Sequence, residues 1–186
     1  MRKIENFENV QAVTGDFARP TAGGYICKIV NVVDTPMDAN TGKGDYLRVE
    51  YDICDGEFSG FYMEQYSKFG GTWNASFIRS YKEKALGMFK HFVNCVEKSN
   101  SGYTWNFVES ELIGKVVGLV LGEEEYKNNN GEVKTKLAVK EVKTVEQIKS
   151  GDFKVPAPKK LQEDTNSSDF MTPAFMPAMT DEDLPF

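Results

Sequence analysis

Residues 46–54, YLRVEYDIC, alternate between two kinds of side chain along their whole length. One set is Leu47, Val49, Tyr51 and Ile53, and the other is Tyr46, Arg48, Glu50 and Asp52. Successive side chains of a β-strand point to opposite faces of a sheet, so this period of two predicts a strand buried on one face only. Such a strand needs partners beside it and a layer beneath it, which indicates a domain built around a β-sheet.

Other segments show the same β character. Residues 25–33 are rich in β-branched side chains and precede a long polar stretch at residues 34–45. Asp55-Gly56 is a tight-turn dipeptide, and the aromatic run after it predicts a third strand in residues 57–66, forming an antiparallel hairpin with the second. Two further strands are predicted at residues 112–121 and 133–142, joined by a polar loop at residues 122–132.

A change of period marks one helix. From Phe77 to Lys98 the apolar side chains recur every three or four residues, as they do in an amphipathic helix. These side chains are Ile78, Tyr81, Ala85, Phe89, Phe92 and Val96. We expect the helix to end at residues 99–102, where Asn and Gly favour the left-handed backbone of a helix C-terminus.

Three strands, a helix and two more strands follow in the order expected of an OB-fold, a five-stranded Greek-key barrel with its helix between strands three and four. The predicted fold class is therefore mainly β, of OB type. Ligands of that fold bind to strands two and three and to the loops between strands one and two and between strands four and five. Here those loops are residues 34–45 and 122–132. A generic α+β sandwich with the same order of elements is the alternative.

The chain divides into three regions. Residues 1–22 show no clear period and are expected to form an N-terminal arm. Residues 23–155 make up the predicted domain, and Pro156 and Pro158 mark its exit because proline denies a sheet its backbone donor. Residues 156–186 are rich in Asp, Ser, Thr and Pro and lack any period, so we expect a disordered acidic tail.

Composition argues against several classes of function. The single histidine, His91, rules out a multi-histidine metal site, and Cys27, Cys54 and Cys95 form no C-x-x-C pair. We therefore expect no enzymatic activity and no cofactor, with a metal-dependent nuclease as the alternative. No run reaches the roughly 20 apolar residues of a membrane span, and the first ten residues lack the apolar segment of a secretory signal, so we expect a cytoplasmic protein.

Charge is distributed unevenly along the chain. The net charge is -6, but residues 133–160 carry eight Lys against three acidic residues, which gives +5. Residues 161–186 carry six acidic residues and no base, which gives -6. The basic stretch predicts a surface for a polyanion, and we expect the acidic tail to fold back over it when no polyanion is bound.

Cations and aromatic rings are the two components of a site for single-stranded nucleic acid, since cations follow the phosphates and bases stack on rings. Lys134, Lys136 and Lys140 occupy alternate positions of one strand and are expected to share a face. Tyr46 and Arg48 share the exposed face of the second strand. The other predicted contacts are Tyr62 and Tyr66 on the third strand, Trp73 after it, and Lys28 on the first strand. The alternative is that the rings are core residues and the lysines protect an edge strand.

The last six residues, Asp181-Glu182-Asp183-Leu184-Pro185-Phe186, closely resemble the C-terminal tip of bacterial single-stranded DNA-binding proteins. In that family the tip follows a disordered linker and docks onto replication, recombination and repair proteins. The resemblance implies the same role here. The Phe186 side chain would fill an apolar pocket, its carboxylate would meet a basic side chain, and the three acidic residues would meet a basic rim.

Four stretches of the body resemble the single-stranded DNA-binding proteins that phages and integrative elements of Gram-positive bacteria encode. They are residues 23–29, 80–86, 88–90 and 99–105. The resemblance implies an OB-fold protein that binds and protects single-stranded DNA with little sequence preference inside a bacterial cell. Bacterial members of that family are often tetramers, so the resemblance is compatible with a homo-oligomer as well as with a monomer. The alternative is an OB-like adaptor that binds a protein or an oligosaccharide and no DNA.

Overall fold

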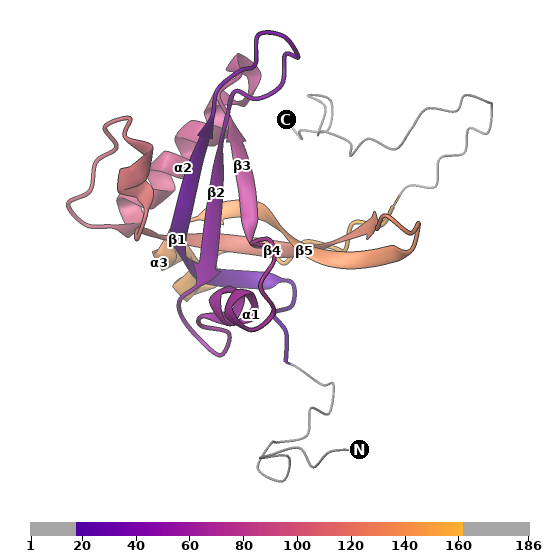
Figure 1. The fold of residues 1–186 in the computed structure, drawn as a ribbon. Coiled ribbons are helices and arrows are strands. Elements are labelled where there is room, and N and C mark those ends of the chain that lie inside the picture. The colour runs from indigo at the N-terminus through magenta and orange to yellow at the C-terminus, as the bar shows by residue number, and fades with distance from the viewer. Residues whose placement is uncertain (1–17, 162–186) are drawn as a thin grey trace, which may run out of the picture.

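The computed structural model describes residues 18–161, which form one antiparallel sheet of five strands with helices around it (Figure 1). The strand order across the sheet is β3-β2-β1-β4-β5. The bounds are β1 Gly23–Thr35, β2 Tyr46–Ile53, β3 Ser76–Ser80, β4 Val116–Lys127 and β5 Val133–Lys143. The predicted mainly β class is thus confirmed. Most of the predicted N-terminal arm and of the acidic tail lies outside the described residues.

β1 takes part in two pairings because it is long and bent. Residues 23–28 pair with β4, residues 27–35 pair with β2, and the β1–β2 register shifts between Ile29 and Asn31. An irregularity of this kind bends a strand and increases its twist. The β4–β5 hairpin, which pairs with the first half of β1, consequently runs across the second half of β1 and across β2 and β3 (Figure 1). β3 and β5, the two edges of the sheet, come close together without forming a ladder among the described residues.

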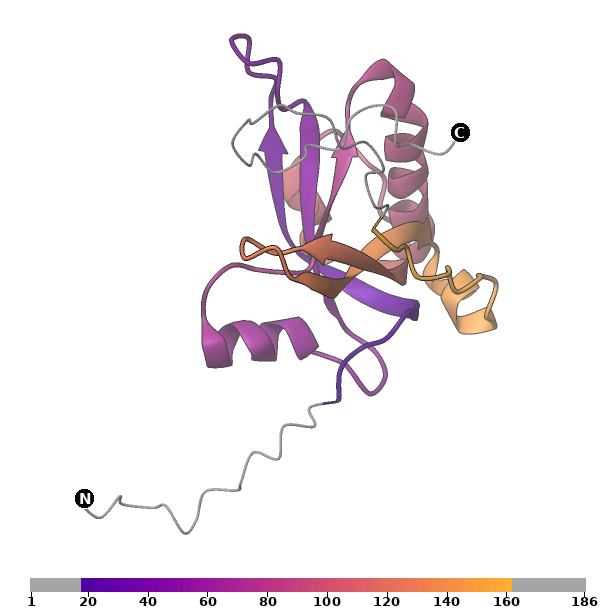
Figure 2. The same ribbon diagram turned by 90° about the vertical axis from the view of Figure 1, so that its right-hand side faces the viewer.

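The core lies between the sheet and helix α2, Leu86–Ser99, which follows β3 and covers the sheet (Figure 2). The apolar set of β2 is buried as its alternation predicts, with each side chain at most 2% exposed. Phe92 and Val96 of α2 pack into the same cluster as Leu119 of β4. Burying one such side chain contributes roughly 1.5–3 kcal/mol to folding, so this layer holds α2 on the sheet.

Three shorter elements complete the described fold. One turn of 3-10 helix, Glu83–Ala85, precedes α2, and another, Glu109–Leu112, precedes β4. Helix α3, Val145–Ser150, begins with a capping box in which Thr144 and Gln147 exchange side-chain and backbone hydrogen bonds. No helix within residues 18–161 is both long and apolar enough to cross a membrane.

The segment after the Asp55-Gly56 turn is helical, so the prediction of a hairpin between strands two and three is wrong. Helix α1, Phe61–Phe69, occupies much of the run that was expected to be a strand. The aromatic side chains of this run recur every three or four positions, which is a helical period. The Asp52 carboxylate also accepts hydrogen bonds from the backbone N–H groups of Tyr62 (3.0 Å) and Met63 (3.2 Å), donors that a helix leaves unpaired at its start.

The third strand is β3, at residues that the sequence assigned to the start of the helix at 77–98. The α-helix begins only at Leu86. β3 pairs with β2, with Phe77 opposite Val49, and Phe77 is buried while Ile78 is 41% exposed. A strand of five residues is too short for its alternation to stand out against the helical spacing that follows, so pairing with β2 decides its conformation.

The predicted loop at residues 122–132 is mostly strand. β4 continues to Lys127 and residues 122–127 pair with residues 133–138 of β5, which leaves a turn of residues 128–132. This hairpin projects from the rest of the sheet (Figure 1), and its β4 half, residues 122–127, shows no apolar period, which is why the sequence suggested a loop there. Beyond α3 the chain returns to β4, where Lys159 makes backbone hydrogen bonds with Glu123 and Glu125.

Candidate nucleic-acid interface

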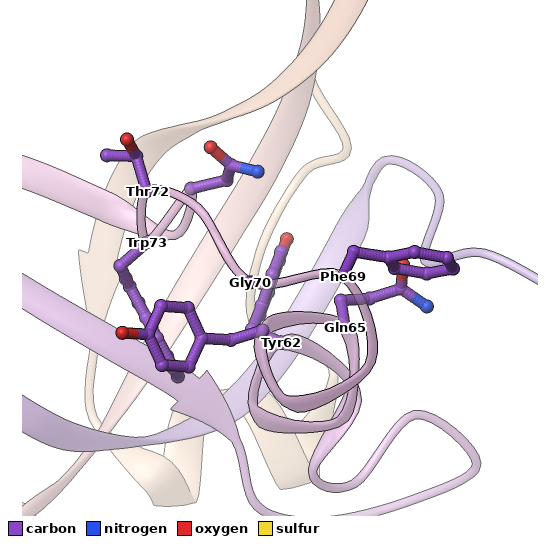
Figure 3. A pocket seen from close by; sticks show the side chains of 8 residues that line it. Tyr62, Gln65, Phe69, Gly70, Thr72 and Trp73 are labelled. Carbon is purple, nitrogen blue, oxygen red and sulfur yellow. The ribbon is translucent and has the colours of Figure 1, made fainter.

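Three of the predicted aromatic contacts line one pocket. It lies between α1 and the segment that leads into β3, and its volume is about 90 Å³ (Figure 3). The lining residues are Tyr62, Gln65, Tyr66, Phe69, Gly70, Thr72, Trp73 and Asn74. Tyr62 and Tyr66 share a face as predicted, but they do so at helical spacing, one turn apart on α1.

The inner wall of the pocket is fixed to β2. The Trp73 Nε1–H group donates to the backbone oxygens of Tyr51 (3.2 Å) and Ala75 (3.0 Å). The Tyr62 ring meets the buried Tyr51 ring edge to face, with 5.7 Å between their centroids. Burial raises the pKa of Tyr62 to about 12. Both rings are thus held against the sheet.

The outer side of the pocket offers rings to solvent. Tyr66 is 46% exposed and lies 5.7 Å from Trp73 between ring centroids, with the planes tilted by 54°. Phe69, at the end of α1, is 71% exposed. Phe69 was missed by sequence reasoning, since its position three residues after Tyr66 matters only once the segment is known to be helical. A base stacked on such a ring contributes about 1–3 kcal/mol to binding.

Tyr46 and Arg48 lie on β2, and Lys28 lies on β1. Arg48 is 45% exposed at its side chain, and its Nη2 is 3.2 Å from Glu50 Oε1. The other oxygen of that carboxylate, Oε2, accepts from the Asn31 side chain (3.0 Å). Lys28 is exposed and lies opposite Asp52 in the β1–β2 register. These residues form an outer row along the sheet, and none of them lines the aromatic pocket.

The three predicted lysines of β5 lie on one side of the β4–β5 hairpin. Lys134 is opposite Tyr126 and Lys136 is opposite Glu124, and the Lys136 ammonium stands 5.6 Å from the Tyr126 ring centroid. Lys140 pairs with the Glu124 carboxylate. Tyr126, 37% exposed, was missed because its segment was expected to be a loop. The hairpin therefore combines cations with an aromatic ring.

Carboxylates offset part of this charge. Glu132 lies 3.4 Å from Lys134 Nζ. Burial on its own would raise the pKa of the Glu124 carboxyl, but Lys140 and the neighbouring Lys136 lower it overall. Glu124 is consequently ionised at neutral pH. The folded surface around the basic stretch therefore carries less positive charge than the sum of +5 over residues 133–160 suggests.

Figure 2 shows how these groups are arranged: α1 and the tip of the β4–β5 hairpin project toward the same side of the molecule. The aromatic pocket and the lysines of the hairpin come from segments far apart in the sequence, and the bent β1 is the strand that connects their two parts of the sheet. The predicted residues thus fall into three groups: the aromatic pocket, the row of Tyr46, Arg48 and Lys28 on β2 and β1, and the lysines of the hairpin. None of the hydrogen bonds, ion pairs and ring contacts described above joins one group to another.

Other predicted features have different outcomes. Within residues 18–161 no group of three His, Cys, Asp or Glu side chains is arranged to hold a metal ion. The predicted partner-binding tip, residues 181–186, lies outside the described residues.

Comparison with known proteins identifies no family. No family model matches the chain. A search of the curated proteins found no match either. The resemblance to single-stranded DNA-binding proteins therefore stays a prediction, and the geometry of the described residues carries the functional argument.

Proposed function

We propose that this protein binds and protects single-stranded DNA with little sequence preference, without enzymatic activity, during replication, recombination or repair. The observation that carries the proposal is the aromatic pocket. Tyr66 and Phe69 offer exposed rings beside Trp73, whose indole donates to the backbone oxygens of Tyr51 on β2 and of Ala75 just before β3. Rings of this kind accept any base, because every base has a flat π face.

The arrangement of the sheet supports the same function. An antiparallel order of β3-β2-β1-β4-β5 is what a five-stranded OB barrel gives when it is open between its third and fifth strands. We therefore propose an OB-type barrel whose open side lies between β3 and β5. Arg48 and the lysines of the hairpin would contact phosphates on either side of the aromatic pocket.

The C-terminal tip supplies the second half of the proposal. Asp181, Glu182 and Asp183 followed by Leu-Pro-Phe form an acidic segment with an apolar end, which suits a basic-rimmed apolar pocket on a partner protein. Binding of DNA by the body and of a replication, recombination or repair protein by the tip would bring the partner to single-stranded DNA.

Fluorescence anisotropy of labelled oligo(dT), titrated at several salt concentrations with duplex DNA as competitor, tests the proposal. The wild-type protein is expected to bind in a salt-sensitive way and to ignore the duplex. Tyr66→Ala and Phe69→Ala should each weaken binding by about 1–3 kcal/mol, or roughly 5- to 150-fold, through the loss of one stacked base.

Phe107→Ala is the matched control. Phe107 is 84% exposed in the loop after α2 and does not line the pocket, so its removal should leave affinity unchanged. Absence of wild-type binding even at low salt would overturn the proposal and favour an adaptor that binds a protein or an oligosaccharide. Equal losses in the pocket variants and in the control would show that the pocket is not the binding surface.

A further inference from the structure

Arg79 on β3 is a cation with no carboxylate partner among residues 18–161. Its Cζ stands 4.6 Å from the centroid of the Phe77 ring, and its Nη1 donates to the backbone oxygen of Ile78 (2.9 Å). Its Nε is buried, and no described residue forms a hydrogen bond with it. β3 pairs it with Leu47, a fully buried residue, so the guanidinium stem lies on the core side of the sheet.

This arrangement is costly for the isolated protein. A half-buried guanidinium without a counter-charge loses solvation that an aromatic ring restores only in part. Burial accordingly lowers the pKa of Arg79 to about 10. An apolar side chain of the same length would fill this position without that cost. An anion that arrives from outside would supply the missing partner.

Two lysines add positive charge at the same place. Burial raises the pKa of the Cys95 thiol on α2, while the charges of Lys98, Lys143 and Arg79 oppose that rise. The Cys95 thiol also donates to the backbone oxygen of Val142 (3.8 Å), the residue before Lys143, so the three cations belong to the place where β3, α2 and the end of β5 meet. Glu141, 51% exposed at its side chain, is 3.2 Å from Lys143 Nζ, which leaves the charge of this group positive.

We propose that the seam between β3 and β5 binds a phosphate of the single-stranded DNA backbone through Arg79, with Lys98 and Lys143 beside it. The planar guanidinium fork matches the geometry of a phosphate, and the Arg79 side chain is only half-buried, so an anion can approach it from solvent. This site rests on the proposed function, because its ligand is the DNA bound at the aromatic pocket.

The path between the two sites is short. Trp73 and Arg79 are six positions apart along a segment that leads into β3, so their Cα atoms are at most about 22 Å apart. An OB domain covers about 4–16 nucleotides, which is ample to reach both. A strand that stacks on Tyr66 and Phe69 would thus pass along β3 and place one phosphate at the seam.

The slope of log affinity against log salt tests the site, because each phosphate contact with single-stranded DNA contributes about -0.7 to it. Arg79→Met keeps the length of the side chain and removes the charge. It is expected to make the slope shallower by about 0.7 and to weaken oligo(dT) binding about ten-fold or more at low salt. Lys115→Met, which removes a cation that stands over the Tyr103 ring, is the control and should keep the wild-type slope.

Thermal unfolding of each variant separates binding from folding. Arg79→Met is expected to unfold at the wild-type temperature or above. If Arg79→Met fails to fold, Arg79→Lys tests the phosphate contact instead, since lysine keeps the positive charge and lacks the planar guanidinium. The salt slope of Arg79→Lys should then stay at the wild-type value while its affinity for oligo(dT) falls several-fold. Wild-type binding with an unchanged slope in Arg79→Met, or with unchanged affinity in Arg79→Lys, would overturn the seam site alone. Absence of wild-type binding would overturn the proposed function itself.

Discussion

Asp52 is the one charged residue that is buried among residues 18–161, at 6% exposure. Its Oδ1 accepts from the backbone N–H groups of Ile53 (2.9 Å) and Tyr62 (3.0 Å), and its Oδ2 accepts from that of Met63 (3.2 Å). One carboxylate therefore joins the end of β2 to the start of α1. It positions the helix that carries the exposed rings of the pocket.

Asp52→Asn should destabilise the protein. The amide retains one acceptor but loses the second and the negative charge that favours a helix N-terminus, so we expect a loss of about 1–3 kcal/mol in the free energy of unfolding. Asp55→Asn is the control, because Asp55 is exposed and accepts a hydrogen bond, within residues 18–161, only from the adjacent Gly56. Its effect should stay below about 0.5 kcal/mol. Urea denaturation measures both. Equal stabilities for the two variants would contradict the role assigned to Asp52.

At the scale of elements, α1 is attached to the sheet by aromatic contacts as well as by Asp52. The Tyr62 ring contacts Tyr51 on one side and Phe61 on the other, with centroid distances of 5.7 and 5.3 Å. Burial raises the pKa of Tyr51 above its usual value and that of Tyr62 to about 12. The packing of α1 therefore depends on both phenols being neutral.

This dependence predicts a loss of stability in alkali. In the unfolded chain a tyrosine titrates near pH 10, whereas folded Tyr62 holds its proton to about pH 12. The contribution of Tyr62 is fully present below pH 10 and is lost as pH rises through 12, which amounts to about 1–3 kcal/mol. Melting temperatures between pH 9 and 12 measure it. Tyr62→Phe cannot ionise and should lose less stability across that window than the wild type; parallel curves would refute the assignment.

The wrong predictions of a strand at residues 57–66 and of a helix beginning at Phe77 have a cause at the level of secondary-structure elements. The period of the aromatic residues in 57–66 fits a helix once α1 is known, but the Asp55-Gly56 turn after a clear strand favours a hairpin when only the sequence is read. The acceptor that starts the helix, Asp52, precedes its donors by about ten residues and sits on the polar side of a half-buried strand. Nothing local marks it as a helix partner.

At the scale of the whole molecule, the basic residues 133–160 and the acidic tail, residues 161–186, carry opposite net charges. Residues 133–160 sum to +5, but Lys134, Lys140 and Lys143 are each within reach of a carboxylate. The free positive charge of the body is therefore smaller than the sequence suggests. Attraction between the body and the -6 tail should be weak enough for DNA to compete with it.

Deleting residues 162–186 is expected to tighten oligo(dT) binding, most strongly at low salt. The deletion removes all six acidic residues of the tail and keeps Leu161, whose backbone N–H group donates to Glu125. The gain should shrink as the screening length falls from about 10 Å at 0.1 M salt to about 3 Å at 1 M. A full-length variant with the six acidic residues changed to Asn or Gln should gain as much as the deletion. Affinity that does not change at low salt in either protein would disprove competition by the tail.

The sequence by itself determined the features that depend on local periodicity. The alternation of residues 46–54 identified the face of β2 that carries the apolar core, and the spacing from Phe89 to Val96 identified α2. In these segments a single face is buried, so the pattern of apolar side chains records it directly.

Only the tertiary structure decided which residues come together. The pocket forms because α1 packs against β2, which brings together Tyr62, Tyr66 and Trp73. Two hydrogen bonds between residues distant in the sequence hold this arrangement, one to the Asp52 carboxylate and one from the Trp73 indole. The cations around Cys95 meet because β3 and the end of β5 converge on α2. Such contacts join segments far apart in the chain and leave no period in the sequence, because the physical partner of each residue is set by the packing of whole elements.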